Sequence, residues 1–181
     1  IIGILAAIAV PNFLNAQIRA KVARAVSDMK TLETALEMYA LDEGEHPPAN
    51  QARVAGSGDN FHPNEIRFYR LTTPVAYLSA IPNDPFVSQG SEDFDKWGDS
   101  YDYVNSYDGN ITGWGHEWRI NSWGPDQRNG WGGQRWGRCE NGEPKGDFVY
   151  NTTNGLTSRG DIIWVGPKAG GNNYCNIQNG V

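Results

Sequence analysis

The chain opens with ten residues that carry no polar side chain, IIGILAAIAV at positions 1–10. As an α-helix this run spans about 15 Å, at a rise of 1.5 Å per residue. A bilayer core of about 30 Å requires roughly 20 apolar residues, so the run amounts to half of a membrane-spanning segment. We expect it to belong to a membrane helix whose first half precedes Ile1. A buried helix start in a globular protein is the alternative.

An amphipathic pattern follows the apolar run and predicts one helix of some forty residues. Gly44, with Pro47 and Pro48 behind it, ends that helix. Gly3 lowers the helix propensity, and Pro11 removes a backbone donor and clashes one turn back, so we expect a kink or local break at Gly3 and Pro11. Apolar residues recur every three or four positions along one helical face: Leu14, Ile18, Val22, Val26, Met29, Leu32, Leu36 and Tyr39.

The remainder of the chain is rich in turns and short strand patterns. Residues 49–64 read as a polar loop, and residues 66–81 as one short helix or as two that Pro74 separates. The pattern therefore predicts an α+β chain in two parts, with the long helix in residues 1–48 and a globular head in residues 49–181. Strand patterns occupy residues 101–107, 116–123 and 162–165, with 148–150 as a weaker fourth.

Composition excludes several classes of protein. The net charge of −6 and the pI near 5.0 lack the basic footprint of a nucleic-acid-binding protein. Aromatic residues make up 12% of the chain, which is too many for a disordered one. The three histidines have no nucleophile motif around them, and neither GxSxG nor a P-loop occurs. We therefore expect no enzymatic activity.

The N-terminal segment IIGILAAIAVPNFLNAQIRA and its amphipathic continuation resemble the type IV pilin and pseudopilin superfamily. The downstream pieces IPNDPF, SYDYV, SWGPD and SRGDIIWVG resemble the G-type major pseudopilin of type II secretion, in the same order along the chain. The resemblance covers roughly half of the chain. It implies a pilin fold, in which the long helix packs on a small antiparallel sheet with long loops.

The resemblance also implies the function, a structural subunit that polymerises into a pilus or a type II secretion pseudopilus. The helices of neighbouring copies would pack together and bury their apolar residues. We expect Leu14, Ile18, Val22 and Val26 to face neighbouring helices, and Met29, Leu32, Leu36 and Tyr39 to face the subunit's own sheet. The residues expected in the filament core are Ile1, Ile2, Ile4, Leu5, Ile8, Val10, Pro11, Phe13, Leu14, Ile18 and Val22.

Partners and location follow from the same resemblance. The main partner would be the chain itself, in a homopolymeric helical filament. A prepilin peptidase and an inner-membrane assembly platform are implied as well. The subunit would sit in the inner membrane before assembly, and afterwards in a cell-surface filament or a periplasmic pseudopilus.

Two further features concern the C-terminal loops. Cys139 and Cys175 are the only cysteines; in an extracytoplasmic protein they are expected to form a disulfide, as in many pilins, with two free thiols as the alternative. G-type pseudopilins bind calcium through loop oxygens, and Ser122, Asp126 and Asp161 are the matching positions. A long insertion, residues 127–157, departs from that pattern, so no cofactor is required and calcium is an open expectation.

Asn110 and Asn151 begin the sequons NIT and NTT and are candidate glycosylation sites. The segment NGWGGQRWG suggests an alternative function, because Trp131 and Trp136 could stack on a sugar. The chain would then be a membrane-tethered carbohydrate-binding or hydrolytic domain. Aromatic plugs in a subunit interface would produce the same composition.

Overall fold

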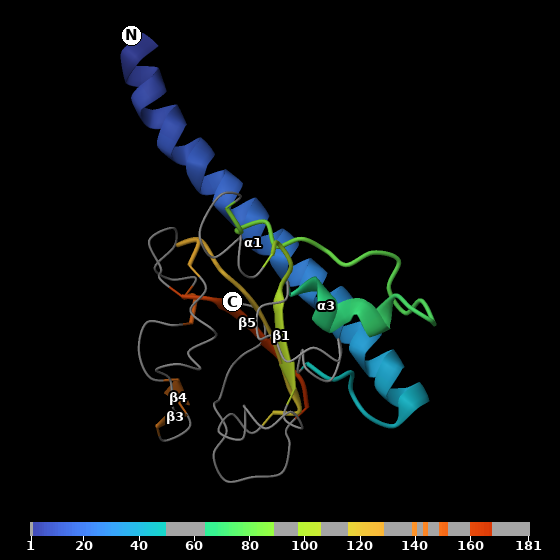
Figure 1. Ribbon diagram of the computed structural model, residues 1–181. Helices are drawn as coiled ribbons and strands as arrows, with labels where there is room; N and C mark the ends of the chain where they lie inside the picture. Colours follow the sequence, from blue (N-terminus) through green and yellow to red (C-terminus); the bar gives the residue numbers. More distant parts are fainter. Residues whose placement is uncertain are drawn as a thin grey trace.

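The computed structural model describes residues 2–49, 64–88, 98–105, 116–128, 149–151 and 160–167, together with the backbone of 139–140 and 143–144. Its longest element, α1, projects well beyond the other described elements with its first half and lies along them with its second half (Figure 1). In chain order the elements are α1 (Ile2–Glu43), α3 (Glu65–Phe68), the 3-10 helix η1 (Tyr69–Leu71), β1 (Asp102–Asn105), β2 (Trp118–Ser122), β3 (Cys139–Glu140), β4 (Glu143–Pro144) and β5 (Ile162–Val165).

Helix α1 is continuous over 42 residues and contains Pro11. The local break expected at Gly3 and Pro11 is therefore absent from the single chain. Gly3 lies in the first turn, where backbone N–H groups have no intrahelical partner in any case. Pro11 removes a single backbone hydrogen bond, and the turns on either side hold the helix together.

The second half of α1 packs on the head with one stripe of side chains. Met29, Leu32, Leu36 and Tyr39 are buried in the head's core, as predicted. The expectation for Val22 is wrong, because this side chain is only 8% exposed and belongs to the same core. Regular apolar spacing along a helix does not show which of the apolar residues are covered by the chain's own head and which by a neighbouring copy.

Ile18 and Val26 correct the same expectation in part. Both are half-buried and pack against the head's core, so neither is fully available to a neighbouring helix. Leu14 is 51% exposed and does lie outside the head. The division between the two halves of α1 therefore falls near Ile18.

The head's main sheet is antiparallel with the strand order β1-β2-β5. The central strand β2 pairs Ile120 with Tyr103 on one side and with Trp164 on the other. The predicted strand at 162–165 is confirmed. Strand β1 begins one residue later than expected, and the predicted end at 106–107 lies outside the described residues; β2 is shorter than expected at both ends. Around the weak fourth candidate, Val149 forms only an isolated bridge to Asp161. The β3–β4 ladder was not expected, since strands of two residues leave no periodic signal.

The helical segment predicted within 66–81 is shorter than expected. Helical structure runs through α3 and η1 and ends at Leu71, before Pro74. A proline disfavours the α conformation in the residue before it, which explains an end on this side of Pro74. The backbone N–H of Leu78 then donates to the carbonyl of Leu71 (2.9 Å), which folds the following turn back onto η1.

Candidate functional site

The first half of α1 is an apolar surface without a cover. It contains no charged side chain before Arg19. This helix is long and apolar enough to cross a membrane, and none of its most apolar 18-residue window is buried. Soluble monomers rarely expose contiguous apolar surface of this kind, so lipid or another protein must cover it. Its large apolar side chains are between 51% and 85% exposed: Ile2, Ile4, Leu5, Ile8, Val10, Phe13 and Leu14.

These seven residues all belong to the predicted filament core, and Pro11 lies exposed among them. Ile18 and Val22 pack against the head, as described above, and Ile1 lies outside the described residues. We call residues 2–14 the apolar arm. One continuous helix holds the arm in a fixed direction relative to the head.

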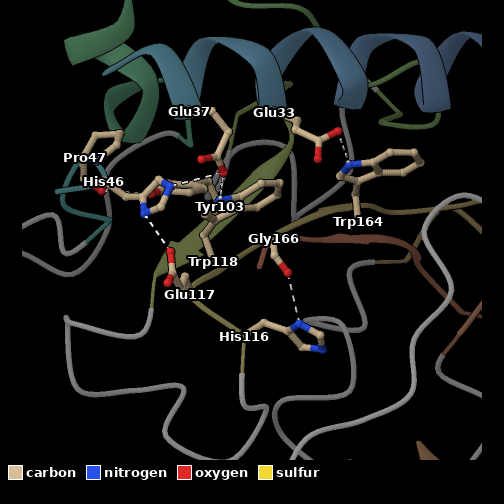
Figure 2. A network of polar contacts seen from close by, with 10 residues as sticks. All are labelled: Glu33, Glu37, His46, Pro47, Tyr103, His116, Glu117, Trp118, Trp164 and Gly166. Atoms are coloured by element: carbon tan, nitrogen blue, oxygen red, sulfur yellow. Dashed lines mark hydrogen bonds and ion pairs between the residues drawn. The ribbon is translucent and has the colours of Figure 1, made fainter. Parts of the chain in front are cut away.

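Two tryptophans of the sheet fasten the second half of α1 to the head (Figure 2). On β5, Trp164 donates from Nε1 to Glu33 Oε2 (3.0 Å). On β2, Trp118 donates from Nε1 to Glu37 Oε1 (2.9 Å). The glutamates are one turn apart on α1, so the helix is fixed to two neighbouring strands. This arrangement sets the direction in which the apolar arm leaves the head.

The segment that follows α1 contacts the same part of the head. His46 is buried, with Nε2 3.3 Å from Glu37 Oε1 and Nδ1 3.6 Å from Glu117 Oε2 (Figure 2). The carbonyl oxygen of Pro47 accepts hydrogen bonds from Tyr103 Oη (2.9 Å) and Asn105 Nδ2 (2.8 Å). These contacts hold the chain against β1 and β2 after the helix ends. Sequence reasoning read Pro47 as a stop signal and missed its role as an acceptor.

Asp84 organises the corner where the loop before β1 meets the end of β2. Its carboxylate accepts hydrogen bonds from Phe86 N (2.9 Å), Ser122 Oγ (2.9 Å) and Trp123 N (2.8 Å). Burial of the carboxyl raises the pKa of Asp84 to about 6, although the three donors oppose the rise. Sequence analysis included Asp84 only within the segment IPNDPF, because two of its partners, Ser122 and Trp123, lie 38 and 39 residues downstream.

The three candidate calcium residues lie near this corner but are engaged with other groups. The Asp126 oxygens accept from Arg128 N (3.2 Å) and from Gly160 N (3.1 Å). Asp161 Oδ2 accepts from Asn121 Nδ2 (3.0 Å), and the Ser122 hydroxyl donates to Asp84. Within the described residues, no group of three His, Cys, Asp or Glu side chains could hold a metal ion. By themselves these residues do not form a calcium cage, and calcium stays a prediction.

A charged cluster lies under the other face of β2. Arg67 Nη1 donates to Asp102 and to the carbonyl of Tyr103 (2.8 Å). Arg119 Nη2 lies 3.8 Å from Asp102 Oδ2, and burial lowers the pKa of its guanidinium. Burying these charges costs desolvation free energy, and removal of one partner would leave an uncompensated buried charge. Sequence reasoning missed this cluster, because its members come from three separate segments.

Several expectations fall outside the described residues. Cys175, Asn110, Trp131 and Trp136 lie there, and of Cys139 only the backbone in β3 is described. The disulfide, the first sequon and the sugar-stacking surface therefore stay predictions. Asn151 is described and exposed, as a glycosylation site requires.

Comparisons with known proteins agree with the resemblance seen in the sequence. The type II secretion system core protein G of Klebsiella michiganensis is 33% identical over 121 residues, which are 63% of this chain and 83% of that protein. The core protein G of Vibrio cholerae is 35% identical over 108 residues, 60% of this chain and 64% of that protein. That of Escherichia coli K12 is 33% identical over 105 residues, 58% of this chain.

This chain spans less than two thirds of the Vibrio and Escherichia proteins, at 64% and 63% of their lengths. No protein-family model matches it, and no solved structure does. Its long apolar helix on a small antiparallel sheet is nevertheless the pilin arrangement. With the identity to the Klebsiella protein over most of that protein's length, the conclusion is that this chain belongs to the family of type II secretion system core protein G, whose members are structural pseudopilins and not enzymes.

Proposed function

We propose that this chain is the repeating subunit of a type II secretion pseudopilus and polymerises through the apolar arm. The observation that carries the proposal is the exposure of the arm on a helix whose other half packs against the head along one side. Covering the arm with copies of itself gains about 25 cal/mol for each Å² of apolar surface removed from water. Each copy would contact one neighbour through its own arm and a second neighbour through the surface that binds that neighbour's arm. A head-to-tail contact of this kind generates an open helical polymer.

Before assembly, the same surface would sit in the inner membrane. The arm would lie in the bilayer, with the head on the periplasmic side. Extraction into the filament exchanges lipid contacts for contacts with other arms. A prepilin peptidase and an inner-membrane assembly platform are the partners that this route requires.

The relatives favour a periplasmic pseudopilus over a long cell-surface pilus, because each is named a core protein of a type II secretion system. The tethered carbohydrate-binding alternative gains no support from the described tryptophans. Trp118, Trp123 and Trp164 are buried, and the Nε1 atoms of two of them donate to α1.

The first test is electron microscopy of sheared and envelope fractions from the native cells, with mass spectrometry of the same fractions. We expect short filaments of this chain associated with the envelope, and longer ones when the chain is overproduced together with its assembly proteins. A chain that stays monomeric in the membrane under both conditions would contradict the proposal. Saturable glycan binding by such monomers would favour the alternative function.

The C-terminal loops carry two further proposals. We infer a disulfide between Cys139 and Cys175, which the periplasmic location of the head would allow. Peptide mapping without reduction should recover the two cysteines in one linked peptide. Calcium binding by the loop of Asp126 and Asp161 is tested on the same sample, as a rise in melting temperature that EGTA reverses.

A further inference from the structure

The face of α1 that points away from the head has an unusual composition. Arg24, Lys30 and Asp42 are the charged side chains close to it, and its own members carry no charge although they are exposed to solvent. Exposed helix faces normally carry charged and long polar residues. We call this surface the outward face, and its members recur every three or four positions: Ala20, Ala23, Ser27, Thr31, Thr34, Met38 and Leu41.

The two threonine hydroxyls of the outward face are already satisfied within the helix. Thr31 Oγ1 donates to the carbonyl of Ser27 (3.1 Å), and Thr34 Oγ1 donates to the carbonyl of Lys30 (3.0 Å). Neither hydroxyl needs water, so a partner could cover both without leaving an unpaired donor. Small residues let a second helix approach closely. Met38 and Leu41 add large apolar side chains that are 47% and 85% exposed.

Charge is segregated along the same helix. Exposed Arg19, Lys21 and Arg24 form a basic band next to the apolar arm, and no acidic residue occurs before Asp28. The far end carries an acidic group of three exposed side chains, with no Lys or Arg between residues 31 and 51: Asp42, Glu43 and Glu45. Acidic side chains at the C-terminal end of a helix oppose its dipole. Of the three, Asp42 accepts a hydrogen bond from Tyr77 Oη (2.8 Å) within the same chain, whereas Glu43 and Glu45 are exposed to solvent.

A single displacement of a second copy along the helix axis aligns the charged groups with each other and the apolar arm with the outward face. The basic band and the acidic group are about 22 residues apart, which is about 33 Å along the helix. A parallel copy displaced by that distance would place its basic band beside the acidic group of the first copy. The same displacement places its apolar arm, residues 2–14, level with residues 24–36, where the outward face lies.

We infer that the outward face of α1 docks the apolar arm of a second, parallel copy displaced by about 33 Å, and that the basic band and acidic group set this register. The inference rests on the proposed function and specifies the contact that repeats in the filament. The charges set the register, and the polymer of the proposed function supplies the direction, because an antiparallel pair would meet both basic–acidic contacts at once and close as a dimer. A parallel neighbour satisfies the basic band of one copy and the acidic group of the other, and leaves the opposite pair free for the next copy.

Zero-length carbodiimide cross-linking of the assembled full-length chain tests the register, because it joins an amine to a carboxylate only in direct contact. We expect Lys21 to be joined to Asp42, Glu43 or Glu45. Within one chain the continuous helix holds these groups about 33 Å apart, so the link can form only between copies. Lys30 is the matched control: it is exposed on the same helix but out of register, and should not be joined to these acids.

Lys21→Arg keeps the charge and removes the amine, so filaments should persist while the cross-link disappears. Lys21→Glu and Glu43→Lys should each reduce filament yield about tenfold, and the double variant should restore it to within about twofold. Filaments that form without the Lys21 cross-link, or no rescue in the double variant, would overturn the register and leave the proposed function standing. A wild-type chain that forms no assembly would overturn both.

Discussion

The two halves of α1 belong to one unbroken helix yet have opposite relations to the rest of the chain. The arm, residues 2–14, has Asn12 as its one polar side chain, and none of its residues belongs to the head's core. The second half is striped, and it buries its apolar side while Glu33 and Glu37 accept hydrogen bonds from the sheet. A stripe indicates that the covering surface lies on one side of the helix, whereas apolar side chains on most sides of a helix require lipid or other copies around it.

The largest effect is expected from a charge in the arm. Ile8→Lys places an ammonium group in the middle of the surface that neighbours would cover, and no acidic side chain is nearby in the sequence to pair with it. We expect filaments to disappear entirely in electron micrographs. The melting temperature of the head should stay unchanged, because Ile8 is 61% exposed and contacts no part of the core.

Ile8→Leu is the matched control, since it keeps the apolar volume at the same position, and it should assemble normally. Ile18 is a less suitable position for the charge, because it packs against the head and a substitution there would mix loss of folding with loss of assembly. Normal filaments from Ile8→Lys would show that the arm does not form the core.

In the second half of α1, a substitution that leaves a cavity should lower the stability of the head, the property that Ile8→Lys leaves unchanged. Leu32→Ala removes a fully buried side chain between the helix and the sheet. We expect the free energy of unfolding to fall by about 4 kcal/mol, as for large cavities in well-packed cores. Denaturant titration measures the loss, and Thr34→Ala, at an exposed position two residues away, should change the free energy by less than about 0.5 kcal/mol. Equal losses in both variants would contradict the assigned faces.

The sequence was sufficient for those parts of the fold that a local pattern encodes. The helix, its end near Gly44 and the strand at Ile162–Val165 all follow from apolar spacing and turn residues. The buried side of α1 was predicted for the same reason. Val22 was assigned to the wrong partner, because the spacing of a stripe is the same whether its cover is the chain's own sheet or a neighbour.

The contacts that fix the helix to the head were not predictable. Trp164 and Glu33 are 131 positions apart, and Trp118 and Glu37 are 81 apart. Nothing near either tryptophan indicates an acceptor on α1. Asp84 was missed for a similar reason, since its role depends on donors that only the folded corner brings to it. Polar pairing across such distances is a property of the tertiary structure.

The pH dependence of stability should also distinguish the two regions. The pKa of Asp84 is raised from 3.8 to about 6 in the folded head, so folding favours its protonated form. Its contribution is greatest below pH 3.8 and falls as the pH rises through 6, by about 3 kcal/mol in total. The arm contains no titratable side chain, so its packing has no such dependence.

Asp84→Asn isolates this contribution, because the amide does not ionise. The difference in free energy of unfolding between wild type and variant, measured by urea titration from pH 3.5 to 7, should slope between pH 4 and 6 and be level above pH 6.5. A difference that stays constant over the whole range would show that Asp84 does not titrate in this way.

The smallest effect is expected where α1 meets β2, and it separates the role of an acceptor atom from the role of a charge. Glu37 Oε1 accepts from both Trp118 Nε1 and His46 Nε2, while the carboxylate is partly open to solvent. Glu37→Gln keeps a carbonyl oxygen for the indole, so we expect a loss below about 0.5 kcal/mol, whereas Glu37→Ala leaves the buried Trp118 donor without its partner and should cost about 1 kcal/mol. Thermal unfolding at pH 7 ranks wild type, Glu37→Gln and Glu37→Ala by stability. Equal losses in Gln and Ala would mean that the negative charge beside His46 matters more than the hydrogen bond to Trp118, and that the helix is held to the head by electrostatics there.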